Sequence, residues 1–323
     1  MKVLLKCCSV FLICLNSGTL SAQAVDNNGL ERSIQSDRYF RLNYGNDYFT
    51  ATDYYLTQSI FFELVHPGLR KFPLSRLLIA PAHFEMKYGL ALEHEGYTPT
   101  DYVASEILYG DRPFTADISL KTFAIATDPA HHQRISTALS TGIIGPGAGG
   151  GEMQTYIHEH TPNPIPHGWH NQIANDVVLN YQLSYEKQLL APIRFLNISA
   201  TGMARAGTLS DKASIGMTFM GGLFNNPYQS LALKGKRFQL YAYDHPELSG
   251  VVYDATMQGG LFNKTSPYTI AASEINRAVF RNNWGFVLQF HKLYLEYYQS
   301  YMTREFRTGM EMHNGGIQIG FGF

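Results

Sequence analysis

Residues 179–186 read Leu-Asn-Tyr-Gln-Leu-Ser-Tyr-Glu, so large apolar residues alternate with polar ones. A β-strand turns successive side chains to opposite faces, and this octapeptide therefore predicts a strand with one apolar and one polar face. The same alternation occurs at residues 84–93 and 40–44, and at residues 317–323 Ile and Phe alternate with Gln and Gly. The chain is expected to be an all-β protein.

The composition separates two all-β folds. The 323 residues are 16% charged and 13% aromatic, with 21 Tyr and 20 Phe, whereas soluble domains are about 25% charged. A secreted β-sandwich turns its polar face to water, while a membrane barrel turns large apolar side chains to lipid and polar ones inward. Backbone groups in lipid must be paired, so such a sheet has to close. The final residue, Phe323, resembles the terminal signal of bacterial outer-membrane barrels. We therefore expect a transmembrane antiparallel β-barrel.

The N-terminus predicts a secretory signal peptide over residues 1–24. Lys2 and Lys6 precede or border an apolar stretch, and mostly small residues follow it. All three cysteines lie in this segment: Cys7, Cys8 and Cys14. Residues 25–323 then form a single barrel domain without disulfides or thiol chemistry. The net charge of −1 argues against a nucleic-acid partner, and no run of 18 apolar residues outside the N-terminus offers a helical membrane span.

Alternation marks thirteen candidate strands, yet bacterial barrels have an even number. The weakest candidates are 237–253, which His245-Pro246 interrupts, and 256–264, so we expect twelve strands. The candidates are 38–47, 55–66, 84–97, 116–128, 132–144, 177–190, 193–209, 211–224, 237–253, 256–264, 276–290, 292–303 and 313–323.

Sidedness follows if the first strand begins in the periplasm. The connections 47–54, 98–115 and 145–175 are then extracellular, and the last can hold a short helix from about Glu152 to His160. All three carry polar groups. Taken alone, Asn46-Asp47 could be an Asx turn, Gly-Asp-Arg-Pro at 110–113 a charged turn, and a loop histidine merely solvated. Their convergence on one membrane face favours a dedicated site.

In this order, the motifs resemble the LpxR-type lipid A 3′-O-deacylases of the Gram-negative outer membrane. The resemblance covers about residues 38–323 and is most specific within 45–185. The residues that carry it are Asn46-Asp47-x-Phe49, Thr-Asp-x-Tyr-x-Thr at 52–57, Gly-Asp-Arg-Pro at 110–113, Gly-Glu-x-Gln-x-x-x-His at 151–158, and Gly168-Trp169-x-Asn171-Gln172 followed by Asn175.

The resemblance implies a 12-stranded barrel whose active site lies near the outer leaflet, beneath the loop helix. It implies a Ca²⁺-dependent hydrolase that removes the 3′ acyl or acyloxyacyl chain of lipid A in lipopolysaccharide. By motif position, His158 is the general base, Asn46 and Asp47 lie at the metal, and Thr57 and Arg112 complete the active site. His160 remains an alternative base. The chain departs from the family pattern at Leu56-Thr57-Gln58, at Phe114 and at His170.

Ester hydrolysis by water needs a base and a positive centre for the oxyanion. A neutral imidazole suits the first role, and a cation bound by oxygen ligands, or Arg112, suits the second. Residues 25–323 hold no cysteine and no Gly-x-Ser-x-Gly elbow, which disfavours a covalent route. The rival readings are an outer-membrane phospholipase or other lipid esterase, and a non-enzymatic pore or adhesin. The oligomeric state is left open, with a monomer among outer-membrane lipids as the expectation.

Overall fold

The structure is a computed structural model that describes residues 26–52, 54–233 and 235–323. The predicted signal peptide therefore lies outside the described residues. The described strands are β1 (Tyr39–Asn46), β2 (Tyr55–Val65), β3 (Glu85–Thr98), β4 (Thr115–Asp128), β5 (Gln133–Ile144), β6 (Asp176–Ile193), β7 (Leu196–Gly207), β8 (Ser210–Leu223), β9 (Phe238–Asp254), β10 (Ala278–Phe290), β11 (Leu293–Met302) and β12 (Met312–Gly322). The described helices are α2 (Gly150–Glu159), α3 (Ala255–Gln258) and the 3-10 turns η1 (Leu30–Arg32), η2 (Asp47–Thr50), η3 (Pro67–Lys71), η4 (Pro73–Leu77), η5 (Pro146–Ala148) and η6 (Gly168–Asn171).

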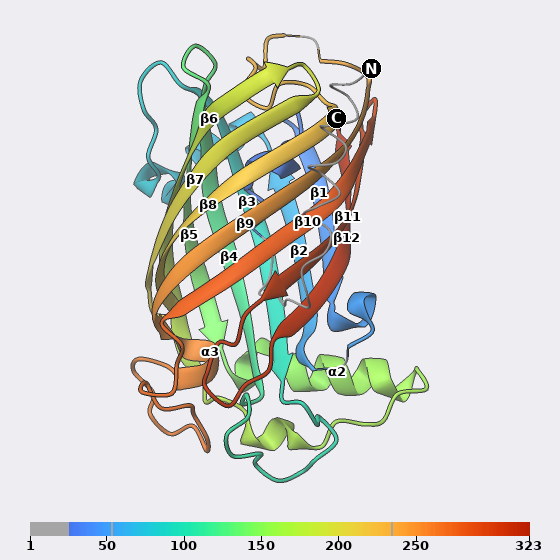
Figure 1. Cartoon of the computed structure of the whole chain (residues 1–323). Helices are drawn as coiled ribbons and strands as arrows, with labels where there is room; N and C mark the ends of the chain where they lie inside the picture. The colour runs from blue at the N-terminus through green and yellow to red at the C-terminus, as the bar shows by residue number, and fades with distance from the viewer. Residues whose placement is uncertain (1–25, 53, 234) are drawn as a thin grey trace.

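The strands form a closed barrel in which sequence neighbours pair all the way round (Figure 1). Antiparallel pairing of β1 with β12 closes it, with Tyr39 opposite Gly322 and Asn46 opposite Gly315. This confirms the prediction of an all-β barrel of twelve strands. In the described part of the chain, no helix combines the length and the hydropathy that a membrane span requires.

The candidate strand at 256–264 is wrong, and its residues form α3 and a loop. The Asp254 carboxylate accepts a hydrogen bond from the Thr256 amide at 2.9 Å, which caps the helical turn. Gly259, at φ 74°, ends it. Local capping therefore overrides the weak alternation of this stretch.

The other weak candidate, 237–253, is confirmed as β9. Proline lacks the amide that a strand donates to its neighbour, so it is tolerated only where pairing lapses. Pairing between β8 and β9 does lapse beside Pro246: it runs as far as Gly216 opposite Glu247 and resumes at Phe219 opposite Asp244. Pro246 therefore removes a few backbone pairs between β8 and β9 and leaves β9 intact.

The barrel wall inverts the arrangement of a soluble sheet. Along β6, Asn180, Gln182, Ser184 and Glu186 are buried inside the barrel, whereas Leu179 on the outside is 50% exposed. Large apolar side chains are exposed in the same way on neighbouring strands: Phe62, Leu92, Ile215, Leu240, Phe286 and Ile319. This pattern matches a wall that faces lipid, and the predicted orientation of the two faces is confirmed.

The two ends of the barrel differ (Figure 1). The connections 47–54, 99–114 and 145–175 share the end that carries α2 and α3, which we call the site end. The C-terminus lies at the opposite end, which we call the turn end because two of its connections, 194–195 and 291–292, are tight turns. The structure thus brings the three predicted loops to one end.

Candidate active site

The first polar pair of the site stands where β1 ends. The side-chain oxygen of Asn46 accepts a hydrogen bond from the Tyr48 amide at 2.7 Å, which starts η2, and its side-chain nitrogen donates to the Thr57 carbonyl. Asp47 follows and is only 4% exposed. Burial and the Asp47 charge raise the pKa of Tyr54 in the same loop. Asn46 therefore ties the loop to β2, and Asp47 places a shielded carboxylate beside it.

Thr57 occupies an irregular position in β2. Leu56 pairs with Tyr97 and Gln58 with Gly96, so Thr57 is an extra residue that has no partner in the β2–β3 register. Such a bulge redirects a side chain locally. The Thr57 hydroxyl accepts a hydrogen bond from the side-chain amide of Gln154 in α2 at 2.8 Å. The bulge therefore links the wall to the loop helix.

Helix α2 starts two residues earlier than the predicted Glu152 and ends at Glu159. Its first residues, Gly150 and Gly151, belong to the helix rather than to the loop before it. A Cβ on Gly150 would lie 2.3 Å from the Ala116 Cβ, and one on Gly151 would lie 3.0 Å from the Trp169 ring. The two glycines thus let the helix approach β4 and the indole closely.

Gln154 connects three elements and was not among the predicted site residues. It is 3% exposed. Its amide oxygen accepts from the Trp169 indole at 2.6 Å, while its amide nitrogen donates to Thr57. Its position four residues before His158, on the same helical face, was the signal that could have identified it.

His158 lies one turn after Gln154 and is half-buried. Its Nδ1 is 2.6 Å from the Pro164 carbonyl oxygen. A carbonyl only accepts, so Nδ1 carries the hydrogen and Nε2 keeps its lone pair. The edge of Tyr102, from the loop between β3 and β4, packs on the imidazole with ring centroids 5.3 Å apart. The ring is held in the tautomer that a general base requires.

His160, the alternative base, lies in a different environment. It is exposed at the end of α2, where its Nδ1 pairs with the Tyr156 carbonyl at 2.7 Å and its ring contacts the Tyr156 ring at a tilt of 40°. No contact in the structure ties it to β1, β2 or the β3–β4 loop within the described residues. The hydrogen-bonded path from Asn46 through Thr57 and Gln154 reaches the side of α2 that carries His158.

Arg112 is enclosed. It is 1% exposed, pairs with the Glu305 carboxylate, donates to the Thr256 hydroxyl at 2.7 Å and stacks over Tyr97 at 4.2 Å. Burial would lower the pKa of this guanidinium, but the charge of Glu305 outweighs it and the pKa is raised. The partners of Arg112 thus come from the β9–β10 and β11–β12 loops. Nothing in the sequence signalled Glu305.

The residues at the end of β1 offer oxygen atoms that calcium could use as ligands. No cluster of three or more His, Cys, Asp or Glu side chains occurs in the described ranges, so a cage of carboxylates is absent from them. Asp47 offers one buried carboxylate, and the hydroxyls of Thr50 and Thr52 lie against its backbone carbonyl at 2.8 and 3.2 Å. Carboxylate, hydroxyl and carbonyl oxygens are the donors that Ca²⁺ prefers. The Asp47 carboxylate and the two hydroxyl oxygens suit a hard cation, whereas the Asp47 carbonyl already accepts hydrogen bonds from these hydroxyls.

Known proteins that are similar to this chain include one family and two solved structures. A family model described as "Outer membrane protein LpxR" matches residues 5–323. The solved structure of LpxR from Salmonella typhimurium matches with a TM-score of 0.72 and 19% identity, over 88% of this chain and 100% of that chain. The β domain of the Bordetella autotransporter Brka gives a TM-score of 0.44 and 7% identity, over 88% of this chain and 98% of that chain. No curated protein matches the chain significantly.

Proposed function

Because the chain belongs to the LpxR family of outer membrane proteins, we propose that it is a lipid A deacylase that hydrolyses the ester-linked acyl or acyloxyacyl chain at the 3′ position. The proposal rests on one observation. A hydrogen-bonded path joins Asn46, Thr57 and Gln154 and presents His158 one helical turn further on, with Nε2 as an acceptor. The path spans β1, β2 and α2, so three separate elements hold the base.

His158 is the general base of the proposed reaction. Its Nε2 takes a proton from a water molecule as that water attacks the ester carbonyl, and the Pro164 carbonyl stabilises the imidazolium through Nδ1–H. The proton then passes to the departing sugar oxygen, which releases a carboxylic acid and the free hydroxyl. Tyr102 holds the ring against rotation during both transfers.

The remaining site residues position this base and the ester. Asp47, with Asn46 and the neighbouring hydroxyls, would hold a calcium ion whose charge stabilises the oxyanion. Thr57 and Gln154 fix the distance between the wall and α2. Arg112, paired with Glu305 and bound to the Thr256 hydroxyl, orders the loops above β3 and β9.

The site end is proposed to face the outside of the cell. Lipid A occupies the outer leaflet, and a site at that level meets the substrate without extracting it. The longest connection, 145–175, and the connections 99–114 and 255–277 lie at the site end, as is usual for the outer side of such barrels, although 66–84 and 224–237 at the turn end are also long. Exposed Tyr48, Tyr109 and Tyr156 at the site end suit a membrane interface.

Mass spectrometry of lipid A from Gram-negative cells that express the protein tests the function. Wild-type protein with calcium should remove a 3′ acyl chain, and His158→Ala inserted at the same level should not. Unchanged lipid A with folded, calcium-supplied wild type would refute the deacylase and leave the pore or adhesin reading. Lysophospholipid release that survives His158→Ala would indicate a phospholipase instead.

A further inference from the structure

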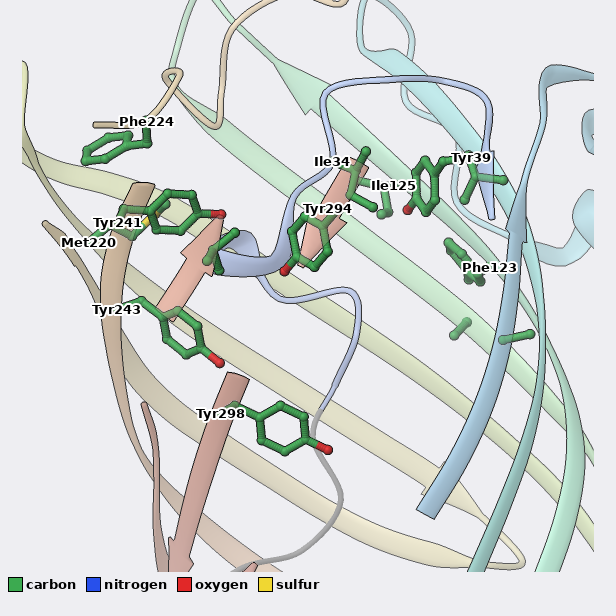
Figure 2. Close-up of a cluster of buried hydrophobic side chains, with 14 residues drawn as sticks. Ile34, Tyr39, Phe123, Ile125, Met220, Phe224, Tyr241, Tyr243, Tyr294 and Tyr298 are labelled. Carbon is green, nitrogen blue, oxygen red and sulfur yellow. The ribbon is translucent and has the colours of Figure 1, made fainter. Parts of the chain in front are cut away.

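A segment outside the strands fills part of the barrel interior. Residues 26–36 precede β1 and run inside the barrel, with η1 at their centre. Leu30, Glu31 and Arg32 are at most 2% exposed although they belong to no strand. Figure 2 shows Ile34 of this segment in the cluster of buried apolar side chains, close to Ile125 and Tyr294 of the wall.

The wall binds the backbone of this segment. Arg41 of β1 donates to the carbonyls of Arg32 at 2.9 Å and Asn27 at 2.7 Å. Lys87 of β3 donates to the Ile34 carbonyl at 2.6 Å. Further backbone contacts come from other strands: the Tyr241 hydroxyl to the Glu31 carbonyl, Arg134 to the Asn28 carbonyl, and the Leu30 amide to the Glu186 carboxylate. Recognition of successive backbone groups fixes the path of the segment through the interior.

Buried charges hold the centre of the segment. The Arg32 guanidinium is 2.9 Å from the Glu296 carboxylate of β11 and 2.9 Å from Glu31. It also lies over the rings of Tyr243 and Tyr298. Withdrawal of the segment would leave Glu296 without this cation in a closed space, which is costly. The segment is therefore a fixed part of the barrel.

A polar cavity of about 130 Å³ lies next to the segment. Asn28, Gly29 and Glu31 line it on one side, and Asp254 and Thr256, where β9 meets α3, line it on another. This volume is well above the roughly 10–15 Å³ that a single water molecule needs. Buried side-chain oxygens that have no protein partner face this space: Asp117 Oδ1, Thr201 Oγ1 and Ser210 Oγ. The segment separates this cavity from the turn end, because its later residues contact the first residues of β3 and β5.

We propose that residues 26–36 form an interior plug that closes the turn-end half of the barrel to solutes and shuts off the polar cavity beneath the site from the periplasm. The plug is a seal that the chain supplies to itself, in place of the side chains that fill the interior of smaller barrels. The plug proposal does not depend on the proposed function, since none of the contacts that support it involves lipid A hydrolysis.

Cysteine accessibility tests the plug. Residues 26–323 contain no cysteine, so Ser184→Cys introduces one reporter into the cavity wall. A membrane-impermeant maleimide should label this reporter slowly in the otherwise unchanged protein. Deletion of residues 26–33 should speed the labelling by an order of magnitude or more. Ser273→Cys, at an exposed position of the β9–β10 loop, is the matched control and should react equally in both backgrounds.

A point variant covers the case in which the deletion fails to fold. Leu30→Glu places a carboxylate beside Glu186, which accepts the Leu30 amide, and should expel the plug while leaving every strand intact. Heat-modifiable migration on gels confirms a folded barrel. Fast labelling of Ser184→Cys with the plug present, or slow labelling in both folded plug variants, would overturn the proposal.

Discussion

Polar side chains around the plug and polar side chains at the site end differ in how fully they are paired. Around the plug, Arg134 meets Glu186 at 2.6 Å and Arg41 meets Glu63 at 2.8 Å, and all four side chains are almost fully buried. At the site end, half-buried His158 has one ring nitrogen bound to a carbonyl and the other left to accept. Buried ion pairs hold the interior around the plug, and a half-buried imidazole with one nitrogen left to accept can perform chemistry.

Arg112 shows that position alone does not decide between these roles. It lies in a site-end loop, yet Glu305, Thr256 and Tyr97 enclose its guanidinium, and the side chain is as buried as that of Arg32. Its substitution should therefore resemble that of an interior ion pair. The predictions that follow test the distinction between buried ion pairs and a ring nitrogen left to accept.

The largest effect is expected at the base. His158→Ala should lower the rate of fatty acid release from lipid A by about 10²–10⁴-fold, the usual contribution of a general base. His160→Ala is the matched control and should stay within a few-fold of wild type, because His160 contacts only its own helix turn. Initial rates of the purified protein in detergent with calcium measure both. A larger loss for His160→Ala would reverse the assignment.

A comparable effect on stability is expected in the plugged half. Arg134→Ala leaves the Glu186 carboxylate buried without its partner and should cost about 3–5 kcal/mol of unfolding free energy. Urea unfolding followed by the fluorescence of Trp169 and Trp284 measures it. Arg134→Met combined with Glu186→Gln removes both charges and should recover most of the loss. If Arg134→Ala were as stable as wild type, the Arg134–Glu186 pair would not be shielded from water.

The proposed cation should stabilise the folded protein. At calcium a hundredfold above its dissociation constant the gain is about 2.7 kcal/mol. Asp47→Asn should abolish this calcium-dependent rise in melting temperature. Asp101→Asn removes an exposed carboxylate and keeps the oxygen that accepts the Val103 amide, so it should retain the rise. Equal calcium responses of both variants would exclude Asp47 as a ligand.

A smaller effect is expected where α2 meets the wall. Gly150→Ala inserts a Cβ 2.3 Å from Ala116, and such overpacking costs about 1–3 kcal/mol. The helix should shift and the hydrolysis rate should fall. Gly149→Ala meets no atom within 4 Å and incurs only the strain of its positive φ, so it should lower stability while sparing the rate. Identical rates for the two variants would show that the packing of α2 does not position His158.

The smallest effect is expected from a single hydroxyl. Thr57→Val removes the acceptor of the Gln154 amide, a loss of about 1 kcal/mol in transition-state stabilisation. Thr57→Ser keeps the hydroxyl and should keep the rate. Steady-state kinetics on lipid A separate the two. Equal rates for the valine and serine variants would remove Thr57 from the path to the base.

The barrel could be predicted because strand alternation is local. Each strand reveals its two faces within a few residues, as β6 does, and closure follows from the needs of backbone groups in lipid. Local signals failed only where capping decides the outcome, as Asp254 does at the start of α3. The order of motifs along the sequence can be read without any knowledge of contacts. It was enough to propose four site residues, Asn46, Asp47, Thr57 and His158, whose individual roles stay predictions.

The plug and the partners of Arg112 could not be predicted. Residues 26–36 show neither a period of two nor one of 3.6, and their structure depends on distant side chains. Arg32 and Glu296 are 264 positions apart in the sequence, and Arg112 and Glu305 are 193 apart. An isolated charge in a sequence carries no mark of the partner that will neutralise it.

The position of the plug also determines the order of assembly. Residues 26–36 are synthesised before every strand, yet Asn27 receives the side-chain amide of Gln318 in β12, 291 positions later. Contacts at such separation form late because a long loop must close first. The side chain of Arg41 in β1 binds the plug, while the backbone of the same residue pairs with Gly320 of β12. We therefore expect the first strand to join the last as residues 26–36 are buried, because a barrel that is still open leaves these charges without partners.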